Sequence, residues 1–506
     1  MGERWYSHAI NQPLFRFLMK AIVLVFCLFF IHTIGKTQVS IAPITYSDKP
    51  YENIFFDGSH EGIQPAIRYQ NIKWYPKPSK DNFDLQLIAI EYARRKKSLL
   101  PVVDGFAHSD TRFNCRSAIG VSYESSYKNW TNKTLFTAGW ATTNAPMNQT
   151  QTAFYRRTQP NEYLYTDLRT RFGYTANKTT HISFGIDNQF FGEGYRSLIQ
   201  GDQVAPNPFA LARIHFWKLE YGLLYQGFME KDTANPWKFN TTHYLSFRAS
   251  NRLSFAVFES VLFQPKDVSF KRGFEVEYLN PFVFFRPQEY SIGSTDNVFL
   301  AAQAAYRFQN KCVYTQVSID EFDLTQIRNR TRWWANKYGI QLGIKGNSGK
   351  LMYRFEGNLV RPYMYSHVNN GQNNGHLGRP LAHALGANFV ELLSVFSFPI
   401  DRYMFKAFGT FCLKGYDENG LSYGGDVYQS YVLKPIDKEF NNTIGQGVTI
   451  RKVQLGSEIS TWMKQLDGKI YCQFGLGLIW GDVTTKLQSN LVIGIRSGLF
   501  QERKLF

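Results

Sequence analysis

Long apolar runs are scarce in this chain of 506 residues. The longest lies near the start, from Ala21 to Ile31, and its roughly 11 residues fall short of the 20 or so that a membrane-spanning helix requires. Further along, a charged residue, an asparagine or a glycine interrupts each apolar stretch within a few residues. The sequence therefore excludes a helical membrane protein.

Cysteines are few and never paired at short spacing. Cys115, Cys312, Cys412 and Cys472 lie far apart without a C-x-x-C motif, which excludes a zinc ribbon and a thioredoxin-type site. Cys472 falls on an apolar strand face and is most simply a small hydrophobic residue. The spacing does not determine whether any two of them form a disulfide.

Catalytic motifs are missing as well. The sequence has no H-E-x-x-H, no G-x-S-x-G and no phosphate-binding loop, and the glycines at 475, 477 and 481 lack the G-x-G-x-x-G interval. Asp320 and Glu321 are adjacent acidic residues, but neighbours on a strand should point to opposite faces. The sequence therefore predicts a protein that is not an enzyme and that holds no cofactor or metal.

What the sequence does contain at its start is the pattern of a secretory leader. Arg16 and Lys20 precede the apolar run, and the small residues Gly35 and Thr37 stand just before Gln38. We predict a signal peptide at residues 1–37, with a retained N-terminal anchor as the alternative. Either reading predicts export.

Alternation of apolar and polar residues is the dominant pattern after the leader. In residues 163–174, Leu164, Leu168 and Phe172 share one face while Asp167 and Arg169 share the other. The same period of two recurs at residues 181–187, 300–308, 313–320, 340–344, 351–359 and 491–496. This pattern predicts antiparallel strands joined as hairpins.

A soluble β-sandwich would alternate in the same way. Three further features favour a transmembrane antiparallel β-barrel: the export leader, the 43 Phe, 30 Tyr and 10 Trp, and the contrast between short turns and long loops. The strand near the C-terminus ends close to the aromatic Phe506, as expected of a strand that closes a barrel. The predicted fold class is therefore all-β.

The chain divides into three predicted parts. Residues 1–37 form the leader, residues 38–160 form an N-terminal segment with the first strands, and residues 161–506 form the main barrel. Within the second part, residues 84–97 carry apolar side chains at near-helical spacing and predict one short helix.

The formal charge of +17 is a second global feature, and removal of the leader would lower it to +14. The basic residues are spread singly through the strands, which argues against a nucleic-acid-binding patch. An anionic polysaccharide is the better predicted partner.

Three long motifs carry a resemblance to a known family. Asn188 to Asp202 reads NQFFGEGYRSLIQGD, Leu279 to Asn297 reads LNPFVFFRPQEYSIGSTDN, and Gly375 to Glu391 reads GHLGRPLAHALGANFVE. With DEFDL from Asp320 and WWANKYG from Trp333, they resemble the outer-membrane barrel family of the capsule assembly protein Wzi. They are especially similar to its Bacteroidota branch, named after the gliding motility protein RemB.

The resemblance implies a monomeric barrel of about 18 strands in the outer membrane of a Gram-negative bacterium. Its extracellular loops would bind or organise surface or capsular polysaccharide. In the gliding branch it also implies a contribution to gliding motility or surface adhesion, with gliding or adhesion proteins as further partners. Outer-membrane lipid would surround the wall.

Polar and aromatic residues in these motifs are the candidate ligand-binding residues. They are Arg196, Asp202, Arg286, Glu289, Asp296, Asn297, Trp333, Trp334, Lys337, His376, Arg379 and His383. The two tryptophans beside Lys337 suit a stacked sugar with a carboxylate, and the two histidines, whose spacing specifies no metal, suit bonding to hydroxyls.

Each group has a structural alternative. The residues from Arg196 to Asn297 could form an internal charge network that plugs the barrel, and the tryptophans could belong to an interfacial girdle. The functional rival to polysaccharide binding is a diffusion porin or small-solute channel with an open lumen.

Overall fold

In the computed structural model, the described residues are 63–65, 97–109, 113–142, 154–159, 162–177, 179–230, 237–265, 278, 296–463, 468–482 and 485–497. The predicted leader lies outside them, and so does the predicted helix at 84–97, apart from Lys97, which begins a strand. Within these residues no helix is both long and apolar enough to cross a membrane.

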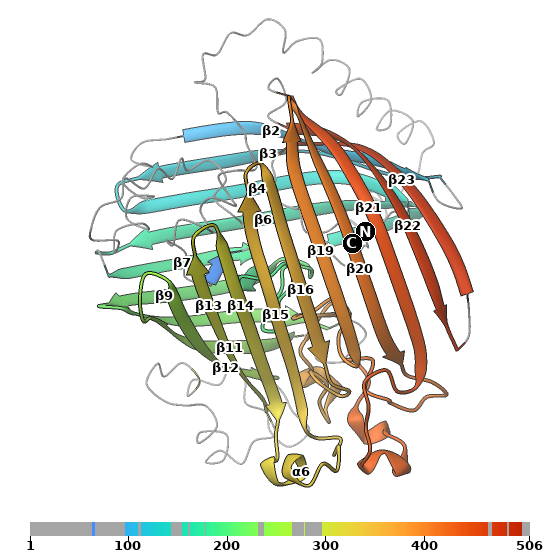
Figure 1. Cartoon of the computed structure of the whole chain (residues 1–506). Helices are drawn as coiled ribbons and strands as arrows, with labels where there is room; N and C mark the ends of the chain where they lie inside the picture. Colours follow the sequence, from blue (N-terminus) through green and yellow to red (C-terminus); the bar gives the residue numbers. More distant parts are fainter. Residues whose placement is uncertain are drawn as a thin grey trace, which may run out of the picture.

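The strands form one closed antiparallel ring (Figure 1). In order around the ring they are β2 (Lys97–Ser109), β3 (Phe113–Tyr127), β4 (Trp130–Thr142), β6 (Glu162–Thr175), β7 (Thr180–Asp187), β9 (Asn207–Phe216), β10 (Leu219–Met229), β11 (Trp237–Arg248), β12 (Leu253–Phe263), β13 (Asn297–Phe308), β14 (Lys311–Glu321), β15 (Lys337–Ser348), β16 (Leu351–Val360), β19 (Phe389–Ile400), β20 (Tyr403–Tyr416), β21 (Val448–Met463), β22 (Gly468–Gly481) and β23 (Thr485–Ser497). Pairing of β23 with β2 closes the ring, in which 18 strands of the described residues follow one another. The predicted number of strands is thus confirmed.

The ring begins at β2, so the first strands expected within residues 38–160 belong to the barrel itself. The division of the chain at residue 160 remains a prediction.

Short elements accompany the ring. β5 (Phe154–Gln159) pairs with β6, β1 (Ile63–Pro65) pairs with β8 (Gln189–Phe191), and β17 (Gly375–His376) pairs with β18 (Arg379–Pro380). The helical turns are α6 (Leu324–Arg328), η4 (Asn370–Gln372), η5 (Tyr431–Leu433) and η6 (Ile436–Glu439).

The two faces of the wall are opposite to those of a soluble protein. On β6, Asp167 and Arg169 are buried inside the ring, whereas Leu164 points outward and is 37% exposed. On β16, Glu356 is buried and Phe355 is exposed. Apolar outward faces and paired backbone groups are what a hydrocarbon environment demands, so the chain forms a transmembrane antiparallel β-barrel.

The two ends of the barrel differ in their connections. At one end, here the turn end, hairpins such as β13–β14 and β15–β16 are joined by two to four residues. At the other, the loop end, 15 residues join β14 to β15, 28 join β16 to β19 and 31 join β20 to β21. Figure 1 shows α6 and the loop between β20 and β21 together at the loop end, as the predicted asymmetry requires.

The two-residue turns explain why the hairpins are so tight. Their first residues adopt positive φ angles that match the twist of the flanking strands: Lys128 (51°), Trp217 (54°), Gln309 (49°), Gly349 (58°) and Asp401 (48°).

Two loops from the loop end fold into the barrel instead of standing above it. The first inner loop, residues 188–206 between β7 and β9, is almost entirely buried, and so is most of the second inner loop, residues 361–388 between β16 and β19. Leu198 of the first loop and Ala382 of the second share one apolar cluster with Phe258 and Phe299 of the wall. The two loops therefore fill the part of the interior that faces β10–β19.

Candidate functional site

The first inner loop is fixed by polar side chains of the barrel wall. Glu356 on β16 accepts hydrogen bonds from the backbone N–H groups of Tyr195 at 2.6 Å and Arg196 at 3.0 Å. Gln341 on β15 donates to the carbonyl of Arg196 at 3.1 Å. The sequence positions the loop in this way because every second residue of each strand points inward.

Glu193 of the same loop is enclosed by two basic residues of the wall. Lys345 Nζ donates to its carboxylate at 2.8 Å and to its backbone carbonyl at 3.0 Å, and Arg307 forms a second ion pair with it. All three side chains are buried. Since an unpaired buried charge is very costly, each of these groups depends on the others.

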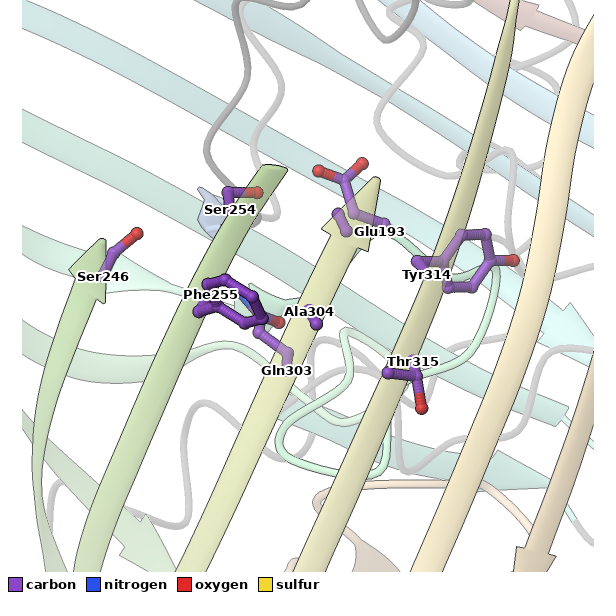
Figure 2. A pocket seen from close by; sticks show the side chains of 9 residues that line it. Glu193, Ser246, Ser254, Phe255, Gln303, Ala304, Tyr314 and Thr315 are labelled. Atoms are coloured by element: carbon purple, nitrogen blue, oxygen red, sulfur yellow. The ribbon is translucent and has the colours of Figure 1, made fainter. Parts of the chain in front are cut away.

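Figure 2 shows a hollow beside Glu193, lined by Ser246, Ser254, Gln303 and Thr315 among others. The empty space at this hollow is about 250 Å³, a figure that includes space open to solvent. The carboxylate of Glu193 is already satisfied by its two cations, so this hollow offers polar hydroxyl and amide groups but no free charge.

Glu391 on β19 joins the two inner loops. Its Oε1 lies 3.3 Å from Arg196 Nη2 in the first loop, and its Oε2 lies 2.8 Å from His383 Nε2 in the second. Leu385 N–H donates to Nδ1 of His383 at 3.1 Å, which leaves Nε2 as the nitrogen that donates to Glu391. Arg196 therefore belongs to an internal charge network, the structural alternative for this residue.

The second inner loop is tied to β10 and β11 by another buried charge. Lys238 donates to the backbone and side-chain oxygens of Asn373, at 2.8 and 2.7 Å, and pairs with Glu230. Close by, Nδ1 of His376 accepts a hydrogen bond from Met229 N–H at 2.9 Å. Burial, with the charge of Lys238, lowers the pKa of His376 to about 3, so the ring is neutral.

Asp296 and Asn297 also face this loop. Gln372 Nε2 donates to Asp296 at 3.0 Å, Tyr278 donates to the same carboxylate at 2.7 Å, and Asn297 donates to the carbonyl of Gln372 at 2.9 Å. Both residues are buried, and their hydrogen bonds hold the second inner loop in place.

The outer aromatic cluster is made of Trp333, Trp334, Tyr363 and Tyr431 at the loop end. The ring of Trp334 lies 4.8 Å from that of Tyr431 and 5.8 Å from that of Tyr363, and Lys434 stands 4.9 Å above Trp334. Trp333 and Trp334 are each half-buried. The cluster thus combines partly accessible aromatic faces with a cation.

Glu439 holds both indoles in place. It accepts hydrogen bonds from Nε1 of Trp333 at 2.8 Å and of Trp334 at 3.2 Å, and Lys434 pairs with it at 3.2 Å. Burial opposes the charge of Glu439, but hydrogen bonds from Trp333 and Lys434 outweigh burial and lower its pKa below the usual value.

Lys337 lies 5.7 Å from the ring of Trp334, but it is not accessible to a ligand there. It is fully buried, 3.2 Å from Glu321 and 3.8 Å from Asp320, and its ammonium lies 4.4 Å above the ring of Tyr431. The expectation that Asp320 and Glu321 point to opposite faces is wrong, because the register with β15 shifts between Ile319 and Glu321 and both carboxylates reach one lysine.

The remaining candidates are less closely connected. Asp202 is half-buried, and Arg379 lies in β18, where burial lowers the pKa of its guanidinium. Arg286 and Glu289 lie outside the described residues. His376 and His383 are buried, so neither belongs to a surface that a polysaccharide could contact directly.

Sequence reasoning did not single out the residues that organise this interior. They are Glu193, Glu230, Lys238, Arg307, Lys345, Glu356 and Glu391. A signal for Glu356 existed, since it lies on the polar face of a predicted strand, and Glu391 ends one of the family-like motifs. No local pattern marks their partners in the first inner loop, Glu193 and Arg196, which lie more than a hundred residues away from the wall residues that they meet.

Cys115, Cys312, Cys412 and Cys472 are all free thiols. Within the described part of the chain, no group of three or more His, Cys, Asp or Glu side chains could hold a metal ion.

Comparison with known proteins identifies a solved structure with a similar fold. No family model and no curated protein sequence matches the chain. Among solved structures, the fold is similar to that of Wzi from Escherichia coli, described as a carbohydrate-binding β-barrel of the outer membrane involved in group 1 capsule assembly. The TM-score is 0.53 at 12% identity, over 89% of this chain and 98% of Wzi.

This similarity shows the fold alone, so the predicted Wzi resemblance is confirmed at that level and the RemB branch remains a prediction. OprD from Pseudomonas aeruginosa matches at a TM-score of 0.44 and 8% identity, over 81% of this chain and 96% of OprD. OpdK from the same organism matches at 0.44 and 7%, over 79% and 98%. Values this low carry no functional argument.

Proposed function

We propose that this protein is an outer-membrane barrel of a Gram-negative bacterium that binds or organises surface polysaccharide through its loop end. It would act as a monomer surrounded by lipid, with an anionic polysaccharide as partner. The fold relative Wzi is itself described as binding carbohydrate in capsule assembly, which supports this assignment.

The observation that carries the proposal is the buried network around Glu391. Two loops folded into the lumen and joined by Arg196, Glu391 and His383 narrow the path through the barrel, whereas a diffusion porin keeps an aqueous channel. Such a network holds a fixed surface at the loop end. There the outer aromatic cluster offers indole faces and Lys434, groups that suit a sugar ring and its carboxylate.

Pull-down of the purified protein with surface polysaccharide tests the proposal. We expect Trp333→Ala and Trp334→Ala to weaken capture, because they remove the accessible aromatic faces. Trp217→Ala is the matched control, since Trp217 is 61% exposed in a hairpin at the turn end. Equal capture by the wild type and the two loop-end variants would argue against the cluster, and absence of capture would argue against polysaccharide binding.

A diffusion porin or small-solute channel is the second candidate. It is favoured by one observation: inward side chains of β21–β23 near the loop end, such as Lys486 and Gln488, are exposed. Conductance across a planar bilayer separates the two candidates.

A contribution to gliding motility or adhesion is the finer part of the proposal. Imaging of both capsule and surface movement in a deletion strain tests it. Loss of surface glycan alone would assign the protein to polysaccharide organisation, and loss of movement with intact glycan would assign it to motility.

A further inference from the structure

The inner face of β21–β23 differs from the interior filled by the two inner loops. Leu455, Leu478 and Leu487 are 58%, 42% and 72% exposed, so this face of the three strands points outward. The alternate residues therefore point inward. Among them, Lys452 pairs across the sheet with Ile479, which in turn pairs with Lys486. Two lysines thus stand in one row, roughly 10 Å apart across two strand spacings.

The next inward row toward the turn end is polar and has a gap at its centre. Gln454 pairs with Gly477, and Gly477 pairs with Gln488. A Cβ placed on Gly477 would lie 3.8 Å from its nearest neighbours, which is ordinary van der Waals contact, so this position has room for a small group. Gly477 therefore lies at the bottom of a shallow groove between the side chains of Gln454 and Gln488, which we call the slot. The rows are roughly 7 Å apart, since they are two residues apart along each strand.

The row below closes the slot. Phe408 covers Gly456, where an added Cβ would lie 2.0 Å from the ring, and Asn490 covers Gly475, where it would lie 2.2 Å from the amide oxygen. The slot thus has a floor at Gly477, a closed end toward the turn end and two lysines toward the loop end.

In the described part of the chain, the polar groups of the slot do not bond to the inner loops, and the cross-strand neighbour of Lys452 is the thiol of Cys412. Among the described residues, the side chains of Lys452, Lys486, Gln454 and Gln488 have no hydrogen-bond or ion-pair partner, in contrast with Lys238 and Lys345 in the filled part. The slot is also reachable. Lys486 and Gln488 are exposed, and Lys452 and Gln454 are half-buried.

We propose that this slot, made of Lys452, Lys486, Gln454, Gln488 and Gly477, binds an acidic sugar unit of the polysaccharide. The lysines pair with its carboxylate, the amides bond with its hydroxyls, and the missing side chain at 477 admits the ring against the wall. This inference rests on the proposed function and identifies its ligand as a carboxylate-bearing glycan.

Binding of a defined oligouronate and of a neutral oligosaccharide to the full-length protein in detergent tests the slot. The double variant Lys452→Gln/Lys486→Gln should weaken oligouronate binding about tenfold or more and abolish its salt dependence. Gly477→Leu should weaken it by filling the space. Matched controls are Lys350→Gln, in a hairpin at the turn end, and Gly357→Leu, on the outward face of β16, both of which should bind as the wild type does.

The outcomes separate the slot from the proposed function. Selective oligouronate binding that is lost in the slot variants, with control variants intact and all variants folded by heat-modifiable migration on gels, supports the slot. Binding unchanged in the slot variants overturns the slot and leaves polysaccharide binding standing. Equal affinity for both sugars overturns the acidic ligand. No binding of either sugar, nor of the native surface polysaccharide, overturns both.

Discussion

Glu391 and Arg196 are 195 positions apart in the sequence, yet their side chains meet inside the barrel at 3.3 Å. The pair connects β19 to the first inner loop. His383 bonds to the other carboxylate oxygen of Glu391 and so connects β19 to the second inner loop. One acidic residue of the wall thus holds both loops that fill the interior. The position of the loops, and through them the shape of the loop end, depends on this carboxylate.

Glu391→Gln should destabilise the barrel and loosen both inner loops. It leaves the buried guanidinium of Arg196 without its counter-charge, a loss of about 3 kcal/mol in the free energy of unfolding. Denaturant unfolding in detergent measures the change. Asp437→Asn, which neutralises an exposed acidic residue at the same end, is the control. Equal stability of the two variants would contradict the central role of Glu391.

The stability of the second inner loop should fall on acidification because of His376. Burial lowers its pKa to about 3, whereas the unfolded ring has a pKa of 6.5. Between these values the unfolded state binds a proton that the folded state excludes, so stability decreases as pH falls below about 6.5, by up to about 1.4 kcal/mol per pH unit.

His376→Gln keeps an acceptor for Met229 N–H and removes this titration. The stability advantage of the wild type over the variant should shrink between pH 7 and pH 4, as measured by denaturant unfolding or by hydrogen exchange in residues 361–388. Parallel pH profiles for the two proteins would show that His376 is not the responsible group.

The natural cysteines test the direction of the strand faces. Cys472 lies between the inward residues Tyr471 and Gln473 on β22 and so points outward, whereas Cys312 is fully buried inside the ring. A lipid-soluble maleimide should label Cys472 in the folded protein and leave Cys312 unmodified until unfolding. Labelling of Cys312 before Cys472 would mean that the inward and outward faces of β14 and β22 are assigned wrongly. Since the described thiols are free, a reductant should leave the unfolding transition unchanged.

The sequence could predict the wall of the barrel and little of what fills it. Residues 163–174 revealed both the strand and its two faces, because alternation is a local property that a lipid-facing wall imposes on every strand. The partners of Arg196 could not be read in this way. Burial of Glu356, Glu391 and Lys345 against a loop depends on how 18 strands close, which no local pattern encodes.

Residues with two plausible roles are where prediction diverged from structure. Lys337 stands beside two tryptophans in the sequence, yet the alternation of β15 turns it into the barrel, where it meets Asp320 and Glu321 of β14. His383 looks like a loop residue available to a ligand and instead bonds to Glu391. In both cases the side chain is paired with a carboxylate inside the barrel, because an unpaired buried charge is costly.

Single-channel recording of the wild-type protein in a planar bilayer tests the central claim most directly. A barrel in which two loops held by Glu391 fill the interior facing β10–β19 should show only a small steady conductance, and Glu391→Gln should raise it. A stable, ohmic conductance typical of an open diffusion pore in the wild type, unchanged in Glu391→Gln, would contradict the account and favour a channel.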